Sequence, residues 1–516
     1  MKKIMSLYES CKTPIRVAYF GFVLIAFGFL IKNDSVNVFY TFRSNVILFF
    51  AELFLRIGEF IIMNLPLIFM LNIVCKKANN ASPVVMALVG YFTFVVTTML
   101  FAPQNLSAQA YATGYGINSV FNVASGTRLP LETGMIGSLL VAYSTRVAFI
   151  LSRHRGDFSL ANILSKESSG LVYNAFFCFI LGVLISYTYP YFYTYIQRSI
   201  VFIGEDLLDP LRIGLYSIID RVLSILGLGN IIRYPFWYTS VGGSFSNTLT
   251  GQSISGDVNI WKYVQESNAS YVGVGRFITP FYVINMFIVP GFYLGTLFSM
   301  SDRIDRGYLT LTFIIGILMS VIAGNPLPVE LLMLFTSPVL LLIYLALVGV
   351  VSGVLINFDA YLGFYSNISN TVIAMPGSFP DFIINLRNVN LIHSLRVILL
   401  VGVSALIIMM FVTMVYYRFF SFEFINNQSA DEFVNKIIET VGGTDNIIDA
   451  GSGLLKLNVY LKDPEKIVIE NIHDTGIKRI METREGLSFE IGTSASIVSR
   501  KIRKALNNAK KQANAS

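Results

Sequence analysis

Long apolar runs with very few charged residues occupy most of the chain before residue 420 and limit its fold more than any other feature. A helix needs roughly 20 mostly apolar residues to cross a hydrocarbon core of about 30 Å, because each residue adds about 1.5 Å. The sequence therefore predicts a polytopic α-helical membrane protein with about 10 transmembrane helices. The expected spans lie near residues 15–31, 47–74, 83–101, 134–152, 171–197, 208–226, 276–300, 308–323, 329–356 and 394–418.

The composition argues against a soluble protein. Of the 516 residues, 54% are hydrophobic and only 13% are charged, whereas soluble proteins average about 25% charged residues. The net charge of +7 fits lysine and arginine gathered in cytoplasmic loops. Because no basic patch is interleaved with exposed aromatic residues, we expect membrane lipid around the chain and no nucleic-acid partner.

The run 208–226 is the weakest predicted span, because four charged residues interrupt it. It could instead lie at the membrane interface as an amphipathic helix. The charged residues are Asp209, Arg212, Asp220 and Arg221.

The distribution of basic residues predicts the orientation. If the N-terminus is cytoplasmic, the loops that hold Lys76, Lys77 and Arg153 also lie in the cytoplasm, where lysine and arginine are favoured. The long loop 102–132 then lies outside, with Arg128 as its only basic residue. An even number of spans returns the chain to the same side, so both termini are expected in the cytoplasm.

The chain becomes polar and charged after the last apolar run. We expect a membrane domain at 1–420, a linker at 421–430, a small α+β domain at 431–508 and a disordered tail at 509–516. Within the α+β domain, apolar periodicity and alternation predict helices at 431–441 and 494–508 and strands at 454–461, 478–483 and 487–491.

Cysteine and histidine are too few and too scattered for a disulfide framework or a metal site. The cysteines lie in or beside apolar runs, and the histidines share no ligand spacing. We therefore expect no metal and no cofactor. These residues are Cys11, Cys75, Cys178, His154, His393 and His473.

Four motifs of the apolar part follow one another in the order found in a known transporter family. They are residues 63–91 with Asn-Leu-Pro and a lysine pair, Thr133-Gly134 with Gly137, residues 227–238 (GLGNIIRYPFWY), and Gly324 to Phe335 (GNPLPVELLMLF). Together they resemble the enzyme IIC permeases of the glucose superfamily in the bacterial phosphotransferase system (PTS). The resemblance implies a dimeric permease in the bacterial inner membrane.

The charged C-terminal part resembles the enzyme IIB domain that is fused to such permeases. The match runs without gaps from Gly442 to Thr493. Residues shared with IIB domains are Gly442, Gly443, Asn446, Ile447, Leu457, Val459, Asp463, Lys466, Gly476, Gly486, Gly492 and Thr493.

In this family a cysteine thiolate on IIB receives phosphate from a soluble partner and passes it to the 6-hydroxyl of a sugar in IIC, since a thiolate is a good nucleophile. The position of that cysteine is occupied by Gly453 in this chain. Two arginines near it in the family are replaced by Lys456 and Asn458, which weakens phosphate binding. The resemblance therefore implies a degenerate member with no catalytic residue in IIB.

The membrane part departs from the family pattern as well. The first glutamate of the family's signature falls at Leu327, and only the second is present, as Glu330. The family's histidine pair falls at Gly229 and Asn230. Three parts of one phosphoryl-transfer reaction are thus absent together, so we expect that this chain does not phosphorylate a sugar by itself.

Several polar residues remain as candidates for substrate binding, each with an alternative. Glu330 could instead mark a helix N-terminus, where the helix dipole favours a carboxylate. Arg233 beside Trp237 could anchor the interfacial aromatic belt, and Asn230 could simply stand at a helix end. The substrate-binding candidates are Glu330, Asn230, Asn325, Arg233 and Trp237.

Three functions stay open on the sequence. The first is a permease for a sugar or related small polar solute that does not phosphorylate it. The second is a membrane receptor or regulator built on a degenerate permease, and the third is an active phosphotransferase that relies on a separate IIB partner. Expected partners are the solute, a second copy of the chain, and a soluble PTS or regulatory protein at the C-terminal domain.

Overall fold

The structure is a computed structural model of the whole chain. It describes residues 2–32, 44–75, 82–112, 128–154, 166–246, 253–267, 273–299, 303–364, 376–386, 388–419, 430–453, 456–467, 480–483, 486–491 and 495–513. Most of the linker expected at 421–430 lies outside these residues.

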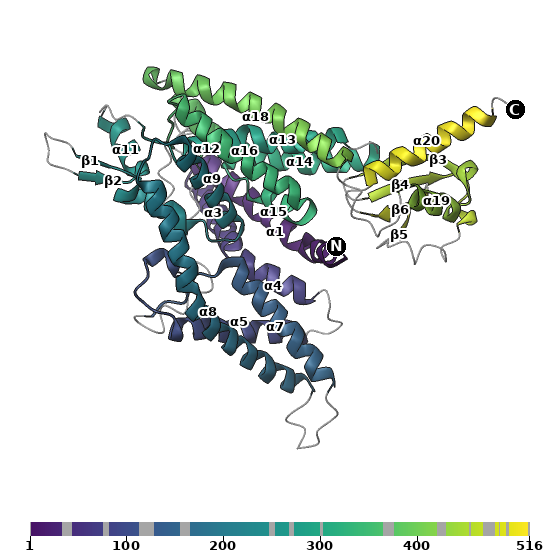
Figure 1. Cartoon of the computed structure of the whole chain (residues 1–516), viewed down its shortest axis with the longest axis horizontal. Coiled ribbons are helices and arrows are strands. Elements are labelled where there is room, and N and C mark those ends of the chain that lie inside the picture. The colour runs from purple at the N-terminus through teal and green to yellow at the C-terminus, as the bar shows by residue number, and fades with distance from the viewer. Residues whose placement is uncertain are drawn as a thin grey trace.

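The described residues before 420 are mostly helical (Figure 1). Its helices are α1 (Lys2–Lys32), α3 (Asn45–Met63), α4 (Leu65–Cys75), α5 (Ser82–Phe101), α7 (Gly134–His154), α8 (Lys166–Gly204), α9 (Pro210–Ile225), α10 (Asn230–Tyr238), α11 (Asp257–Ser267), α12 (Thr279–Val283), the π-helix η3 (Ile284–Ile288), α13 (Val289–Ser299), α14 (Arg303–Ala323), α15 (Leu327–Thr336), α16 (Pro338–Asn357), α17 (Phe379–Asn385) and α18 (Ile392–Phe419). Two short strands, β1 (Ser244–Ser246) and β2 (Ser253–Ser255), form a hairpin between α10 and α11.

Within the described residues, 7 helical segments are long and apolar enough to cross a membrane. Three shorter apolar helical segments lie at Leu65–Cys75, Phe313–Ala323 and Leu327–Thr336. A protein with this many membrane-spanning helices is an integral membrane protein of the polytopic α-helical class, as predicted.

Two of the predicted spans are each divided into two helices. The run 47–74 breaks at Asn64, two residues before Pro66, and the run 329–356 breaks at Ser337, directly before Pro338. Proline disfavours helical backbone in the residue before it and has no N–H to continue the ladder. Apolar composition alone does not reveal such breaks.

Two helices near the centre of the chain are too short to span a membrane. Helix α10 has 9 residues and α15 has 10, which corresponds to about 15 Å, half of the hydrocarbon thickness. Each follows a turn with a glycine at positive φ, Gly227 before α10 and Gly324 before α15. The segments α9–α10 and α14–α15 are therefore each a helix, a turn and a half-length helix. They are called hairpins below, and their tips are the turns at 226–229 and 324–326.

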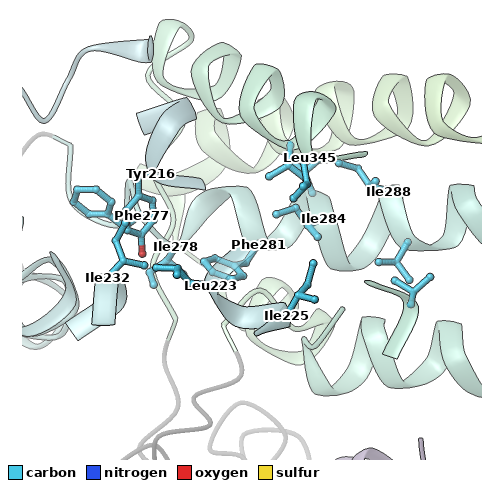
Figure 2. Close-up of a cluster of buried hydrophobic side chains, with 14 of the residues drawn as sticks. Tyr216, Leu223, Ile225, Ile232, Phe277, Ile278, Phe281, Ile284, Ile288 and Leu345 are labelled. Carbon is cyan, nitrogen blue, oxygen red and sulfur yellow. The ribbon is translucent and has the colours of Figure 1, made fainter. Parts of the chain in front are cut away.

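The hydrophobic core of the larger helical group is built around α9, α10, α12 and η3. Figure 2 shows Tyr216 and Leu223 of α9 together with Phe277 and Phe281 in one buried cluster. A second buried cluster holds α4, α5, α7 and α8 together, and Figure 1 shows α4, α5 and α7 close to one another along α8.

The C-terminal part is a small α+β unit with its own hydrophobic core. Its antiparallel sheet has the strand order β3-β4-β6-β5, with β3 (Ile447–Ser452), β4 (Lys456–Leu461), β5 (Ile480–Thr483) and β6 (Gly486–Glu490). Helices α19 (Ala430–Thr440) and α20 (Ala495–Ala513) contribute their apolar faces to this core. Strand β3 was not predicted from the sequence.

Helix α20 reaches further than predicted. It continues to Ala513, into the segment 509–516 that was expected to be disordered. The residues of this extension include alanine, lysine and glutamine, which are strong helix formers. Figure 1 shows the N-terminus and the α+β unit on the same side of the helical part.

Helix α9 begins at a side-chain cap that can be tested. The Asp209 side chain accepts a hydrogen bond from the Leu211 N–H at 2.9 Å, and Pro210 occupies the first helical position. We expect Asp209→Ala to lower the free energy of unfolding by about 1 kcal/mol, measured by thermal unfolding in detergent. Asp209→Asn keeps the cap and should stay close to wild type; equal losses in both variants would contradict this role.

Candidate functional site

A cluster of charged side chains lies where the two helical hairpins meet. Asp220 and Arg221 come from the last turns of α9, Arg233 from α10, and Glu330 from the first turn of α15. Asp220, Arg221 and Glu330 are at most 2% exposed. Buried charges in a membrane protein are costly and mark functional sites, so this is the candidate site, hereafter the hairpin site.

Asp220 is the anion that holds both arginines. Arg221 donates from Nε and Nη2 to Asp220 Oδ2 at 3.0 and 2.6 Å. Arg233 donates from Nε to Asp220 Oδ1, and from Nη2 to Oδ2 at 3.1 Å. Ser224 contributes as well, because its hydroxyl accepts from Arg233 Nη2 at 2.6 Å. One carboxylate thus joins α9 to α10.

Glu330 faces this cluster from the other hairpin. Its Oε1 accepts a hydrogen bond from the Tyr344 hydroxyl at 2.8 Å, and Arg221 Nη1 lies 3.5 Å from the same atom. Its Oε2 is buried and has no hydrogen-bond partner within the described residues. A buried carboxylate oxygen needs a donor, so the hairpin site can accept a hydrogen bond from a ligand.

Phe281 of α12 lies against both guanidinium groups. Its ring centroid is 4.7 Å from Arg221 Cζ and 5.4 Å from Arg233 Cζ. Such cation–π contacts stabilise arginine where water is excluded. Trp237 packs edge-on against Phe281 at 6.1 Å, and its indole N–H donates to the Tyr216 hydroxyl at 2.9 Å. The arginines are therefore fixed in position by aromatic packing as well as by charge.

The structure brings three of the predicted site residues together: Glu330, Arg233 and Trp237. Asn230 is the first residue of α10 and is half-buried. Asn325 lies at the tip of the other hairpin, where its Oδ1 accepts from the Leu327 N–H at 2.9 Å. These positions leave the substrate-binding roles of all five residues as predictions.

The structure removes one alternative for each of two regions. Arg233 is not a simple interfacial anchor, because it is paired with the buried Asp220. The run 208–226 is not a surface helix, because Asp220 and Arg221 on it are buried.

Sequence reasoning missed the residues that organise the hairpin site. In the sequence, Asp220 and Arg221 were used only as evidence against a membrane span at 208–226. Nothing in the sequence around Tyr344 and Phe281 indicated a role in a site. The available signal was the pair of adjacent opposite charges inside an apolar run, since such charges in a span normally face the protein interior and pair.

Two of the positions at which the resembled family carries reactive groups, Leu327 and Gly453, are occupied as follows. Leu327 is the first residue of α15 and is half-buried. Gly453 follows β3, is buried, and donates its N–H to the carbonyl of Lys456, the first residue of β4, at 2.8 Å. Across the described ranges, no three His, Cys, Asp or Glu side chains are grouped as metal ligands would be.

Comparison with known proteins finds similarity to components of bacterial sugar phosphotransferase systems. No family model matches it. It is 23% identical over 522 residues to the "PTS system glucose-specific EIICBA component" of Staphylococcus saprophyticus. The aligned region covers 95% of this chain and 71% of that protein. It is also 23% identical over 520 residues to the component of the same name from Staphylococcus carnosus, with coverages of 95% and 71%.

Proposed function

We propose, from the premise that this chain belongs to the enzyme IIC/IIB family of the bacterial phosphotransferase system, that it carries a sugar or a closely related neutral solute across the membrane. We further propose that it does so without phosphorylating the solute itself. The relatives' printed names specify glucose, which makes glucose and similar hexoses the first solutes to test.

The observation that carries the proposal is the free acceptor of Glu330. Its Oε2 is buried at the meeting point of two half-length helices and makes no hydrogen bond within the described residues. In transporters, half-helix termini near the middle of the membrane commonly surround the substrate. Two arginines balance the two carboxylates of the cluster, so a neutral ligand that donates a hydroxyl fits better than an ion.

Loss of phosphoryl transfer is supported by what stands at the reactive positions. Gly453 has no side chain to accept phosphate, and the chain has no cysteine after Cys178. In the hairpin site, Glu330 shares its Oε1 with Tyr344 and Arg221, and Leu327 offers no second carboxylate. Movement of a bound solute between the two sides needs none of the missing groups.

The remaining features of the proposal follow family membership. We propose that a membrane domain spans 1–420, that a linker spans 421–430 and that the C-terminal domain begins at 431. We also propose that both termini are cytoplasmic and that the permease is a homodimer. A soluble PTS or regulatory protein would meet the C-terminal domain on the cytoplasmic side. The position of the N-terminus and the α+β unit on one side of the helices agrees with that orientation (Figure 1).

Uptake into vesicles tests the proposal. Proteoliposomes that contain only this protein are loaded with buffer and offered a panel of radiolabelled hexoses. We expect one sugar to equilibrate across the membrane and to exchange against unlabelled sugar, with no sugar phosphate formed even when the phosphorylated soluble partner of an active relative is added. Empty vesicles and vesicles with an active relative provide the two controls.

Two outcomes would overturn parts of the proposal separately. Formation of labelled sugar phosphate by this chain would refute the loss of phosphorylation and leave transport in place. Absence of uptake for every sugar, in vesicles where the active relative works, would refute sugar transport.

One contact favours the receptor function as the second candidate. The Ser496 hydroxyl at the start of α20 donates to the Tyr417 carbonyl near the end of α18 at 2.8 Å. The last membrane helix is therefore in direct contact with the C-terminal unit, so a ligand-driven movement of the helices would reach that unit. Sugar binding without uptake, detected as a shift in melting temperature, would support this function.

A further inference from the structure

A fully buried asparagine lies one helical turn after Phe281. Asn285 is 0% exposed and belongs to η3, the π-helix that continues α12. π-Helical turns inside α-helices are rare and frequently occur at functional sites. Asn285 is not among the residues that form the hairpin site, and nothing described so far accounts for it.

Asn285 connects two segments that are distant in the sequence. Its Nδ2 donates to the Gly324 carbonyl at 2.9 Å and to the Pro376 carbonyl at 3.1 Å. Gly324 is at the tip of the α14–α15 hairpin, with a φ of +64°. The side chain therefore ties this tip to the segment before α17. A second link exists, because the Ser320 hydroxyl on α14 donates to the Asn285 carbonyl at 2.9 Å.

The same stretch of chain also holds the other hairpin. Phe281 contacts Arg221 and Arg233 of the α9–α10 hairpin, and Asn285 four residues later bonds the tip of the α14–α15 hairpin. Residues at i and i+4 lie on one face of a helix. Figure 2 shows Phe281 and Ile284 of this stretch and Ile225 at the end of α9 as members of one buried cluster. One short segment thus contacts both halves of the hairpin site.

The cost of keeping an asparagine here argues for a role beyond packing. Its Oδ1 is buried and has no hydrogen-bond partner within the described residues, which costs stability relative to an apolar residue of similar shape. Buried unsatisfied groups are uncommon in native proteins. The Asn285 amide nitrogen offsets this cost by binding the Gly324 carbonyl, which no apolar side chain can do.

We infer that Asn285 is a positioning residue: it fixes the depth of the α14–α15 hairpin tip against η3, and thereby sets where Glu330 stands relative to Arg221. Glu330 follows the tip by one turn of α15, and its amide bonds back to the Pro326 carbonyl at 3.1 Å. A shift of the tip would therefore move the carboxylate. The geometric part of this inference is independent of the solute, and its effect on uptake rests on the proposed function.

Hydrogen–deuterium exchange of the full chain in detergent tests the geometric part. In Asn285→Leu, we expect amide exchange in residues 324–330 to rise at least about tenfold, because the tip loses its anchor. The matched control is Asn174→Leu, since Asn174 is also 0% exposed and donates to the Met86 carbonyl at 2.6 Å, but lies in the α5–α7–α8 group. Asn174→Leu should leave exchange at the tip unchanged.

A milder variant keeps the test valid if Asn285→Leu does not fold. Ser320→Ala removes only the second link and should raise exchange in the same segment, by a smaller factor. Unchanged exchange at 324–330 in whichever variant folds would overturn the inference. An equal rise at the other tip, residues 226–229, would also overturn it, because it would indicate general loosening.

Uptake kinetics separate positioning from a purely structural role. We expect Asn285→Leu to raise the KM for the transported sugar about tenfold while the maximal rate per folded protein changes less. Asn174→Leu should lower the yield of folded protein and leave KM unchanged. If the wild type transports no sugar, the exchange result still decides the inference, so failure of the proposed function and failure of the inference are distinguishable.

Discussion

Replacing Asp220 with alanine is expected to produce the largest loss of stability of any single change in the hairpin site. Asp220 is the direct anion for Arg221 and Arg233, and it is 1% exposed. Removing one partner of a buried ion pair typically costs about 3–5 kcal/mol, because the remaining charge stays buried without compensation. Thermal unfolding in detergent and the yield of folded protein measure the effect.

Two further variants show whether charge is the cause. Asp209→Ala removes a carboxylate from the same helix, where it caps the first turn, and should cost about 1 kcal/mol. The double variant Asp220→Asn with Arg233→Gln removes one negative and one positive charge together and should recover part of the loss. If the double variant is no more stable than Asp220→Asn alone, the charge explanation is wrong.

Replacing Glu330 with glutamine is expected to produce the largest loss of transport. The loss of stability should be smaller than for Asp220→Ala, because Arg221 keeps Asp220 as its nearer anion. Glutamine keeps the shape and can still accept from Tyr344, but it removes the charge on the free oxygen. A hydrogen bond to a charged group contributes about 1.5–3 kcal/mol, and 1.4 kcal/mol corresponds to about a tenfold change in binding. We therefore expect sugar uptake at low concentration to fall about 10- to 100-fold, measured in proteoliposomes.

The chain offers a matched control for this substitution. Glu59 is also buried in an apolar helix, at 5% exposure, and Arg56 Nη1 donates to its carboxylate at 3.2 Å. It lies on α3, outside the hairpin site. Glu59→Gln should leave uptake unchanged, whereas an equal loss in both variants would show that buried charge in general, and not the hairpin site, is required.

The sequence predicts the fold class well because membrane spanning depends on a local property. A run of about 20 apolar residues is long enough to cross a bilayer wherever it occurs. The same holds for much of the α+β unit, where helices α19 and α20 and strands β4, β5 and β6 lie within a few residues of the predicted elements. Strand β3 was missed because its sequence (IIDAGS) has no alternation, and its pairing with β4 makes it a strand.

The sequence could not show which charged side chains in the apolar runs pair with one another. Arg221 and Glu330 are 109 residues apart and meet only because α15 packs against α9. A charged residue in an apolar run shows that some partner exists, since an isolated ion is too costly there, but periodicity gives only the face on which it lies.

The sequence by itself thus determined the membrane class, the small C-terminal unit, the family resemblance and the presence of a glycine at position 453, because each depends on residue type at a position. The tertiary structure alone decided that Asp220, Arg221, Arg233 and Glu330 form one site, and that Asn285 bonds the hairpin tip that precedes Glu330. Contacts across such distances arise from the packing of whole helices, so no local pattern specifies them.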